Sequence, residues 1–235
     1  MSYIRAELKK DAKSQLMGNW GKAIGAMLLV ALFGIVISMV FELLLRTTSY
    51  GMLLNNPEML NSMSEEAILG MLPGILGWSL LFSVAVLVLT APVSIGYCFF
   101  NLGLMRGENV SAVTPFQGFR YLGGTIGLTV LMSLFLFLWS LLLYIPGIVK
   151  SLSYAMAPYI WSDNREMSAR DAITQSRKMM VGHKWELFVL TLSFIPWLLL
   201  VAVTCGLGAL YVQPYMEVTF VNFYERLKND YALEA

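Results

Sequence analysis

The sequence has few of the residues that soluble domains need on their surfaces. Only 13% of its 235 residues are charged and 57% are hydrophobic, against about 25% and about 45–50% in a typical soluble domain. A soluble protein of this composition would lack the polar side chains to cover its surface, whereas a protein in a lipid bilayer faces no such requirement. The composition therefore predicts an all-α integral membrane protein.

Groups suited to metal binding and catalysis are also scarce. The chain has one histidine, His183, and two cysteines, Cys98 and Cys205, which both lie in apolar runs. This pattern argues against an ordinary zinc site and against a disulfide framework. The sequence contains no Gly-Lys-Ser/Thr phosphate loop, no His-Glu-x-x-His and no Gly-x-Ser-x-Gly, the motifs of common nucleotide-driven and hydrolytic enzymes. We expect no enzymatic activity and no cofactor.

What the chain has instead is long apolar runs. A helix needs about 20 mostly apolar residues to cross a bilayer. Six runs qualify as transmembrane helices, at about 21–45, 72–104, 121–144, 146–161, 185–204 and 207–224. Together they predict one six-helix transmembrane domain over residues 21–228, followed by a tail at 229–235.

The distribution of charge predicts the orientation of these helices. With six crossings and the N-terminus inside, 14 of the 16 lysines and arginines fall on inner segments, and only Arg46 and Lys150 fall outside. Basic residues concentrate in this way on the cytoplasmic side, so we expect both termini in the cytoplasm. Because topology accounts for these charges, we expect no nucleic-acid binding.

The outer segment 47–71 has acidic residues and no basic ones. It contains a turn signal, Asn55-Asn56-Pro57, because asparagine and proline favour turns. Ser64-Glu65-Glu66-Ala67 follows and predicts the start of a short helix.

Two segments show the spacing of amphipathic helices at the inner membrane surface. In residues 1–20, the apolar face consists of Ile4, Leu8, Ala12 and Leu16. In residues 168–181, it consists of Ala169, Ala172, Ile173, Ser176, Met179 and Met180, and Ser168 with Asp171 predicts a capping box. Basic helices of this kind bind anionic lipid headgroups, which we expect as partners together with the bilayer.

A repeating pattern runs along the chain. At the start of each odd-numbered run, a glycine is followed within three residues by an aromatic residue suited to the inner interface. These aromatic residues are Trp20, Tyr121 and Trp185, and His183 lies in the last of the three entrances. Each even-numbered run contains one internal proline, and these are Pro92, Pro158 and Pro214. The pattern predicts three parallel repeats of an amphipathic helix and a transmembrane hairpin. The alternative is coincidence, because these residues are common in membrane proteins.

Several motifs resemble those of a known family. They are Gly18-Asn19-Trp20, Tyr144-Ile145-Pro146-Gly147-Ile148-Val149-Lys150, Ser153-Tyr154-Ala155-Met156-Ala157-Pro158-Tyr159, Gly182-His183-Lys184-Trp185 and Phe223-Tyr224-Glu225-Arg226-Leu227. Over most of its length the chain closely resembles the bacterial membrane family called domain of unknown function 975. The resemblance implies a multi-pass protein of the bacterial cytoplasmic membrane, and brings neither an activity nor catalytic residues. More distantly, the chain is similar to membrane domains attached to some glycerophosphodiester phosphodiesterases.

A few polar residues inside the apolar runs are candidates for a site. Glu217 lies near the middle of the sixth run, where an ionisable group costs about 2.5–3.5 kcal/mol on insertion scales. It predicts either a proton-linked or cation-linked site, or a hydrogen bond that locks the helices together. Lys150 either pairs with Glu217 or extends to the outer headgroups.

Other polar and small residues have structural interpretations. Asn101 and Asn222 follow two of the prolines at similar distances and predict equivalent positions, whose alternative role is interhelical hydrogen bonding. Glu42 and Arg46 have the spacing of a local ion pair. Glycines four residues apart predict close helix packing, at Gly21/Gly25, Gly70/Gly74, Gly103/Gly107 and Gly123/Gly127.

Two functions lead at this point, and a membrane-embedded enzyme is a third, less favoured hypothesis. The lack of a catalytic constellation favours a non-enzymatic scaffold, regulator or accessory subunit with a membrane-protein partner. The alternative is a transporter, channel or lipid-handling protein with an intramembrane site around Glu217.

Overall fold

The computed structural model describes residues 2–46, 51, 56, 58, 61–142 and 144–234, which form helices and turns without any strand. Four helical stretches are long and apolar enough to cross a membrane, at Trp20–Arg46, Glu65–Met105, Thr114–Leu141 and Lys184–Val203. The all-helical prediction is confirmed, whereas six spans and the threefold repeat are not. The chain divides into one unit of Met1–Leu29 with Ala91–Ala235 and a second unit of Val30–Thr90.

The Val30–Thr90 unit contains the later part of helix α2 (Trp20–Arg46) and the first part of helix α5 (Glu65–Met105). Phe41 of α2 stacks on Trp78 and Phe82 of α5, which joins the two helices. The predicted ion pair is present, with 2.6 Å between Arg46 Nη2 and Glu42 Oε1. Apolar side chains on both helices are largely exposed, as lipid-facing helices require.

Helix α5 begins at Glu65, before the start of the apolar run at 72–104. The Ala67 amide donates to Ser64 Oγ at 3.3 Å, so Ser64 starts a helix as predicted. That helix is not short, because it continues for 41 residues to Met105 and measures about 61 Å. The predicted helix at 72–104 and the predicted short helix are therefore one. Of the predicted turn at 55–57, the structure describes only residue 56, so this prediction lies outside the described residues.

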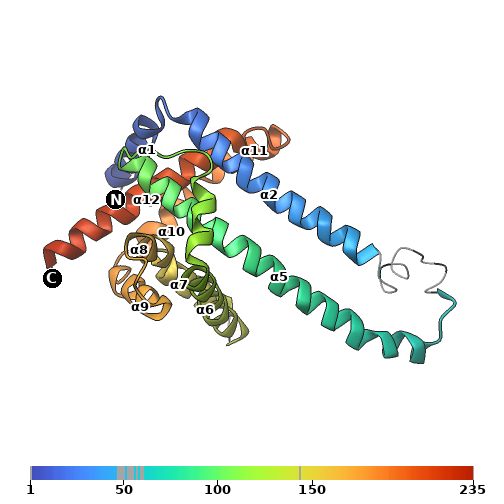
Figure 1. The fold of residues 1–235 in the computed structure, drawn as a ribbon. Helices are drawn as coiled ribbons and strands as arrows, with labels where there is room; N and C mark the ends of the chain where they lie inside the picture. Colours follow the sequence, from blue (N-terminus) through green and yellow to red (C-terminus); the bar gives the residue numbers. More distant parts are fainter. Residues whose placement is uncertain are drawn as a thin grey trace. The chain divides into compact units, whose positions relative to one another are not determined.

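In the other unit, helix α1 (Ser2–Leu16) packs against helix α12 (Ala209–Glu234) (Figure 1). Leu8, Ala12 and Leu16 are buried, which confirms this part of the predicted apolar face. Asn222 Nδ2 of α12 donates to the Leu8 carbonyl at 3.4 Å. The apolar face of α1 therefore packs against the rest of the protein, chiefly against α12. α12 runs on to Glu234, so the predicted tail is helical up to that residue.

The predicted helix at 185–204 consists of two pieces, α10 (Lys184–Leu192) and α11 (Ile195–Val203). Lys9 of α1 binds at their junction, where its Nζ donates to the Ser193 carbonyl at 3.0 Å. The same ammonium lies 4.1 Å from the ring centroid of buried Phe194. A charged side chain from α1 therefore satisfies a carbonyl at the interruption, where the regular helical hydrogen bonds change.

The middle of the chain is built around a hairpin. The 3-10 helix η1 (Thr114–Tyr121) leads into α6 (Leu122–Leu142), and α7 (Tyr144–Tyr154) packs back along α6. The predicted helix at 146–161 is interrupted after Tyr154 and resumes as α8 (Ala157–Asp163). Pro158 lies in the first turn of α8, a position where proline's missing N–H costs little.

Helix α9 (Ala169–Met179) packs on α6, α7 and α8. Its N-terminus confirms the predicted cap, because the Asp171 amide donates to Ser168 Oγ at 3.1 Å. The predicted apolar face is buried at Ala172, Ile173, Ser176, Met179 and Met180. Ser176 Oγ donates to the Ser153 carbonyl at 2.8 Å, which fixes α9 to α7.

Candidate functional site

A network of charged side chains joins the C-terminal ends of α5 and α8 to the second half of α12. α5 ends at Met105, and the turn that follows contains Gly107 at φ 72°, in the left-handed region that glycine favours. Arg106 between them reaches α8 and α12. Its Nη1 lies 2.8 Å from Asp163 Oδ1, and its Nε donates to Glu225 Oε1 at 2.9 Å.

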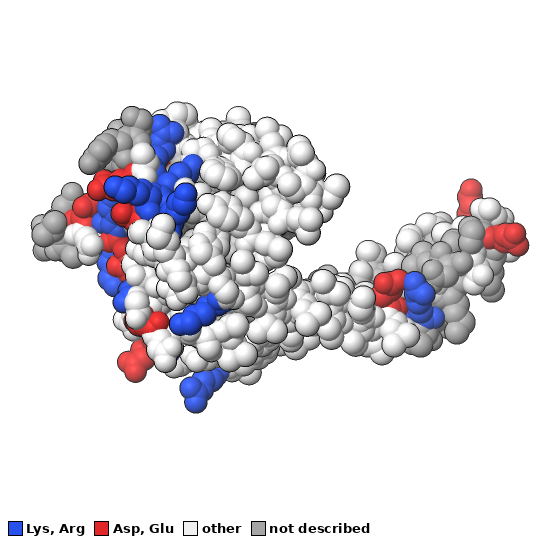
Figure 2. All heavy atoms as spheres, turned by 90° about the horizontal axis from the view of Figure 1, so that it is seen from above, with Lys and Arg blue, Asp and Glu red and all other residues white. Residues whose placement is uncertain are grey.

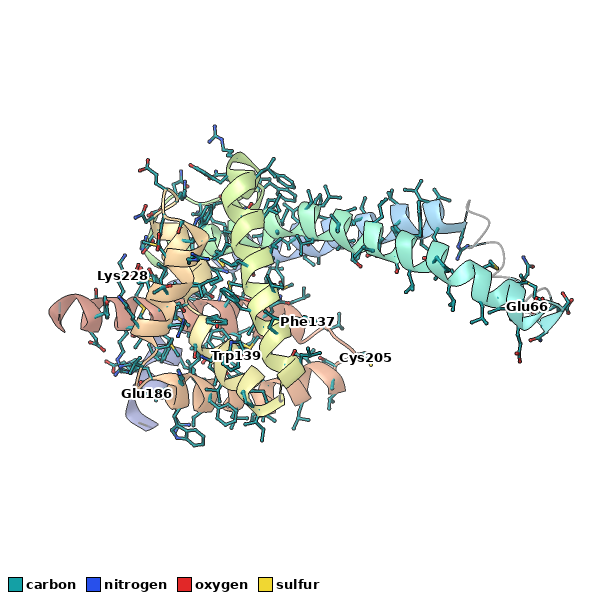
Figure 3. All side chains as sticks on the ribbon, turned by 90° about the horizontal axis from the view of Figure 1, so that it is seen from below. Glu66, Phe137, Trp139, Glu186, Cys205 and Lys228 are labelled. Atoms are coloured by element: carbon teal, nitrogen blue, oxygen red, sulfur yellow. The ribbon has the colours of Figure 1, made fainter. Side chains whose placement is uncertain are left out.

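Asp163 is the centre of this network. Its carboxylate also accepts hydrogen bonds from the Tyr224 hydroxyl at 2.9 Å and from Lys228 Nζ at 2.5 Å. The Asp163 side chain is only 15% exposed. Burial acts to raise the pKa of Asp163, but the hydrogen bonds from Arg106, Lys228 and Tyr224 outweigh it, so the pKa lies below its ordinary value. We call these four residues and Glu225 the Asp163 network; Lys228 is labelled in Figure 3.

A pocket of about 660 Å³ lies beside the network. Arg165 lies over two aromatic rings of its wall, 4.4 Å from the Phe99 centroid and 4.9 Å from that of Tyr121. Arg165 Nη1 also donates to the Tyr121 hydroxyl at 2.9 Å. We call this the Arg165 pocket; it is lined by Phe99, Leu102, Gly103, Arg106, Glu108, Tyr121, Ser162, Asp163, Asn164, Arg165 and Glu166.

Two carboxylates in the Arg165 pocket have no partner among the described residues. Glu108 and Glu166 line it, and neither side chain has a hydrogen-bond or ion-pair partner in the part of the chain that the structure describes. Both residues are exposed. Arg106 is paired in the Asp163 network, whereas Arg165 packs on its aromatic rings and keeps its charge. The lining holds three carboxylates (Glu108, Asp163 and Glu166) against two guanidinium groups, so the net charge of the pocket is negative.

Glu217, the predicted intramembrane residue, lies in α12 within electrostatic range of Tyr97, Cys98 and Tyr159. Among the described residues its carboxylate has no hydrogen-bond or ion-pair partner. Asn101 is buried one turn after Tyr97 on α5. The Asn101 Nδ2 and the Tyr97 hydroxyl have no hydrogen-bond partner of good geometry within the described ranges. The fold thus gathers unsatisfied polar groups from α5 near the Glu217 carboxylate.

The structure does not bring Lys150 to Glu217. Lys150 Nζ lies 4.4 Å from the ring centroid of Trp139, and Lys150 lines a pocket together with Arg177 and Lys184. The prediction that Lys150 lies on the opposite side of the membrane from these two residues is wrong. α9 packs along α7, and this brings all three cations to one place.

The predicted interfacial anchors have different environments. Trp185 is 62% exposed, as a residue in contact with headgroups would be. Trp20 instead stacks on Tyr211 at 4.7 Å between centroids, and Tyr121 belongs to the wall of the Arg165 pocket. His183 Nδ1 lies 3.2 Å from Glu186 Oε2. No cluster of three metal-ligating side chains occurs in the described ranges.

The Asp163 network was not predicted from the sequence. Its partners lie 57 to 119 residues apart, so no local spacing indicates them. The available signal was the position of Arg106, Asp163 and Glu225 just beyond the ends of apolar runs that the orientation places on one side.

Four apolar helices of membrane-spanning length among the described residues define the class of this chain, an all-helical membrane protein. The family model described as "Protein of unknown function (DUF975)" matches residues 1–153 and 141–231. The chain belongs to this family, as the sequence motifs indicated. No curated protein and no solved structure matches. The similarity to membrane domains of glycerophosphodiester phosphodiesterases is not shown by these comparisons.

Proposed function

We propose that the protein is a non-enzymatic scaffold or accessory subunit that holds a basic segment of a membrane-protein partner in the Arg165 pocket. The observation that carries the proposal is the pair of carboxylates, Glu108 and Glu166, which have no partner among the described residues and lie in a pocket lined by more carboxylates than guanidinium groups. A partner's lysine or arginine would pair with them. Complementary charge of this kind gives an interface specificity and a fast association rate.

The geometry of the Asp163 network supports a role in stability over one in catalysis. A general base works best with a pKa near the operating pH, whereas the pKa of Asp163 is lowered by the hydrogen bonds that outweigh its burial. Arg106 and Lys228 are both occupied by this carboxylate. The network therefore supports a rigid wall for the neighbouring pocket.

The expected partner follows from membrane topology. Transmembrane proteins carry lysine and arginine just beyond the cytoplasmic ends of their helices. We place the Arg165 pocket on the cytoplasmic side of a bacterial cytoplasmic membrane, with both termini on that side. A juxtamembrane segment of the partner would then reach Glu108 and Glu166 from a neighbouring helix.

Site-specific crosslinking tests this function. A photo-crosslinking residue at Asn164, inside the pocket, is expected to capture one dominant membrane protein in native membranes. Reversing both charges with Glu108→Lys and Glu166→Lys is expected to lower the yield of that product about tenfold or more, because like charges repel across an interface. The product is quantified by immunoblotting and mass spectrometry.

The matched control reverses two other carboxylates. Glu65→Lys with Glu66→Lys changes the net charge equally in the Val30–Thr90 unit and should leave the product unchanged. An equal yield from the pocket reversal, or capture of only abundant unrelated proteins, would contradict the proposal.

A second candidate function is proton-linked or cation-linked transport, as part of a transporter, channel or lipid-handling protein. The observation that favours it is the Glu217 carboxylate, which lacks a counter-charge among the described residues and lies near buried, unsatisfied groups of α5. Ionisable groups within membrane-embedded helices often mark ion pathways.

For this second function, we expect Glu217→Gln to lower proton flux about tenfold or more, because the amide cannot exchange a proton. The flux is measured in liposomes with an enclosed pH-sensitive dye and an imposed potassium diffusion potential. Glu7→Gln, at an exposed position of α1, is the control. Equal flux through the wild type and Glu217→Gln would remove Glu217 as the site.

A further inference from the structure

A second pocket, of about 330 Å³, is lined by basic residues without an acidic one. The lining residues are Lys150, Ser153, Thr174, Arg177, Lys178, Val181 and Lys184. They come from α7, from the last two turns of α9, from the turn after α9 and from the first residue of α10. We call this the Lys150 pocket. It is distinct from the Arg165 pocket and shares no lining residue with it.

We propose that the Lys150 pocket binds a phosphate group, and that the phosphate belongs to the headgroup of an anionic lipid. Lys150, Arg177, Lys178 and Lys184 supply four cations. The Ser153 and Thr174 hydroxyl groups already donate to backbone carbonyls of their own helices, so the cations carry the proposed contact. Arginine and lysine are the side chains that bind phosphate most effectively, the first through paired N–H donors and the second as a point charge.

Among the described residues, the four cations have no counter-ion. Ion pairs in the described part of the chain involve Arg46, Arg106, His183, Arg226 and Lys228, and none of the four cations of the Lys150 pocket. Lys150 lies within Coulombic range of Arg177 and Lys184. Like charges held this close repel each other, so a bound anion would stabilise the arrangement.

The position of Lys150 distinguishes this pocket from an ordinary helix C-terminus that carries basic residues. Arg177 and Lys178 in the last turn of α9 have a common explanation, since cations favour helix C-termini. Lys150 lies inside α7, directly after Ile148 and Val149, which are exposed apolar residues. Its ammonium rests on Trp139, labelled in Figure 3, a contact that leaves N–H donors for a ligand.

The frame of the pocket is held in place before any ligand binds. The buried hydrogen bond from Ser176 Oγ to the Ser153 carbonyl joins α9 to α7 within the pocket's own wall. Gly182, at φ 83°, makes the tight turn that brings Lys184 back beside Arg177. A preorganised site loses less entropy when it binds.

Apolar residues at the pocket point to a lipid as the source of the phosphate. Val181 lines the pocket and is 71% exposed, and Trp185, next to Lys184, is 62% exposed. Tryptophan favours the headgroup level of a bilayer. Charged side chains of this unit gather at one end of the face in Figure 2, next to a largely uncharged surface. A headgroup can therefore reach the cations while its acyl chains remain in the bilayer.

Native mass spectrometry of the full chain tests the proposal. The protein, released from nanodiscs of phosphatidylcholine with added phosphatidylglycerol, is expected to retain phosphatidylglycerol preferentially. The combined variant Lys150→Gln, Arg177→Gln and Lys184→Gln is expected to weaken this binding about tenfold or more, because each basic residue contributes to attraction of anionic lipids. Arg170→Gln, on α9 but outside the pocket, should change it less than about twofold.

Two further arms complete the test. If the triple variant does not fold, Arg177→Gln with Lys178→Gln replaces it, because both side chains are exposed. Inorganic phosphate is added as a competitor to distinguish the sources. Displacement of the lipid by millimolar phosphate would show that the phosphate group alone is recognised, and its failure would show that the lipid is required. Retention of phosphatidylglycerol by the pocket variants at the wild-type level would overturn the proposal.

Discussion

Replacing Gly96 with alanine is expected to destabilise the protein by about 3 kcal/mol, the upper part of the range for forced overpacking. A Cβ atom at Gly96 would overlap the Pro115 carbonyl, and one at Gly118 would overlap the Pro92 carbonyl. The backbones of α5 and η1 are thus in direct contact at two glycines. Because the obstructing atoms belong to the backbone, no side-chain rotation relieves the overlap. Gly118→Ala should have a similar effect.

The effect is measured as the midpoint of thermal unfolding in detergent, followed by tryptophan fluorescence. The matched controls are Gly123→Ala and Gly127→Ala in α6, where an added Cβ would meet no neighbouring atom. Alanine favours a helix over glycine by about 1 kcal/mol, so these variants should be as stable as the wild type or slightly more stable. Equal losses at Gly96 and Gly123 would contradict a specific contact between α5 and η1.

These glycines also show what glycine spacing can predict. Pairs four residues apart within one run suggested close packing. An added Cβ would lie 3.3 Å from Ala112 Cβ at Gly25 and 2.6 Å from Val110 Cγ1 at Gly103, but one at Gly21, Gly70, Gly107, Gly123 or Gly127 would meet nothing. The closest approach joins Gly96 to the segment containing Gly118, which belongs to a different helix. Sequence spacing indicates which glycines share one face of a helix, but the partner of that face depends on tertiary packing.

The periodicity of apolar residues predicted the structure correctly where neighbouring residues alone determine it. Leu8, Ala12 and Leu16 are buried together as predicted, because residues four apart share one face of a helix. The Ser168 cap is likewise determined within a few residues. Apolar length alone did not reveal where the predicted fourth and fifth helices are interrupted. Lys9 from α1 occupies one of those interruptions, a contact that joins residues 184 positions apart.

The candidate sites also differ in whether a local sequence signal identifies them. Glu217 was identifiable because a single carboxylate in an apolar run is unusual at any tertiary arrangement. Arg106 counted only toward membrane orientation and Asp163 was not singled out, since charged residues at the ends of apolar runs need no further explanation. Lys150 was placed by counting crossings, and this count did not anticipate that α9 packs along α7. The positions of charged groups that depend on tertiary contacts were therefore not predicted from the sequence.

Replacing Asp163 with asparagine is the second change with a large expected effect. The carboxylate accepts hydrogen bonds from Arg106, Tyr224 and Lys228, and a hydrogen bond to a charged group contributes about 1.5–3 kcal/mol. The remaining Glu225 still pairs with Arg106, which limits the loss. We expect Asp163→Asn to lower the free energy of unfolding by about 2–3 kcal/mol, measured by thermal unfolding in detergent at pH 7.

The pH dependence gives this prediction a second measurement. Although burial opposes it, hydrogen bonding lowers the folded-state pKa of Asp163 below its ordinary value. A group with a depressed folded pKa stabilises the fold above its unfolded-state pKa and loses this contribution as the pH falls through the folded pKa. The stability difference between wild type and Asp163→Asn should therefore be complete at neutral pH and shrink from about pH 5 downward.

Asp230→Asn is the matched control for both measurements. Asp230 lies on the same helix as Lys228 and pairs with Arg226 at 3.7 Å, in an ion pair whose side chains are 47% and 31% exposed. Exposed pairs contribute about 0–1 kcal/mol, so this variant should stay near the wild type at every pH. If Asp163→Asn lost no more stability than Asp230→Asn, or if its deficit persisted unchanged in acid, the Asp163 network would not join α5, α8 and α12 in the way its hydrogen bonds indicate.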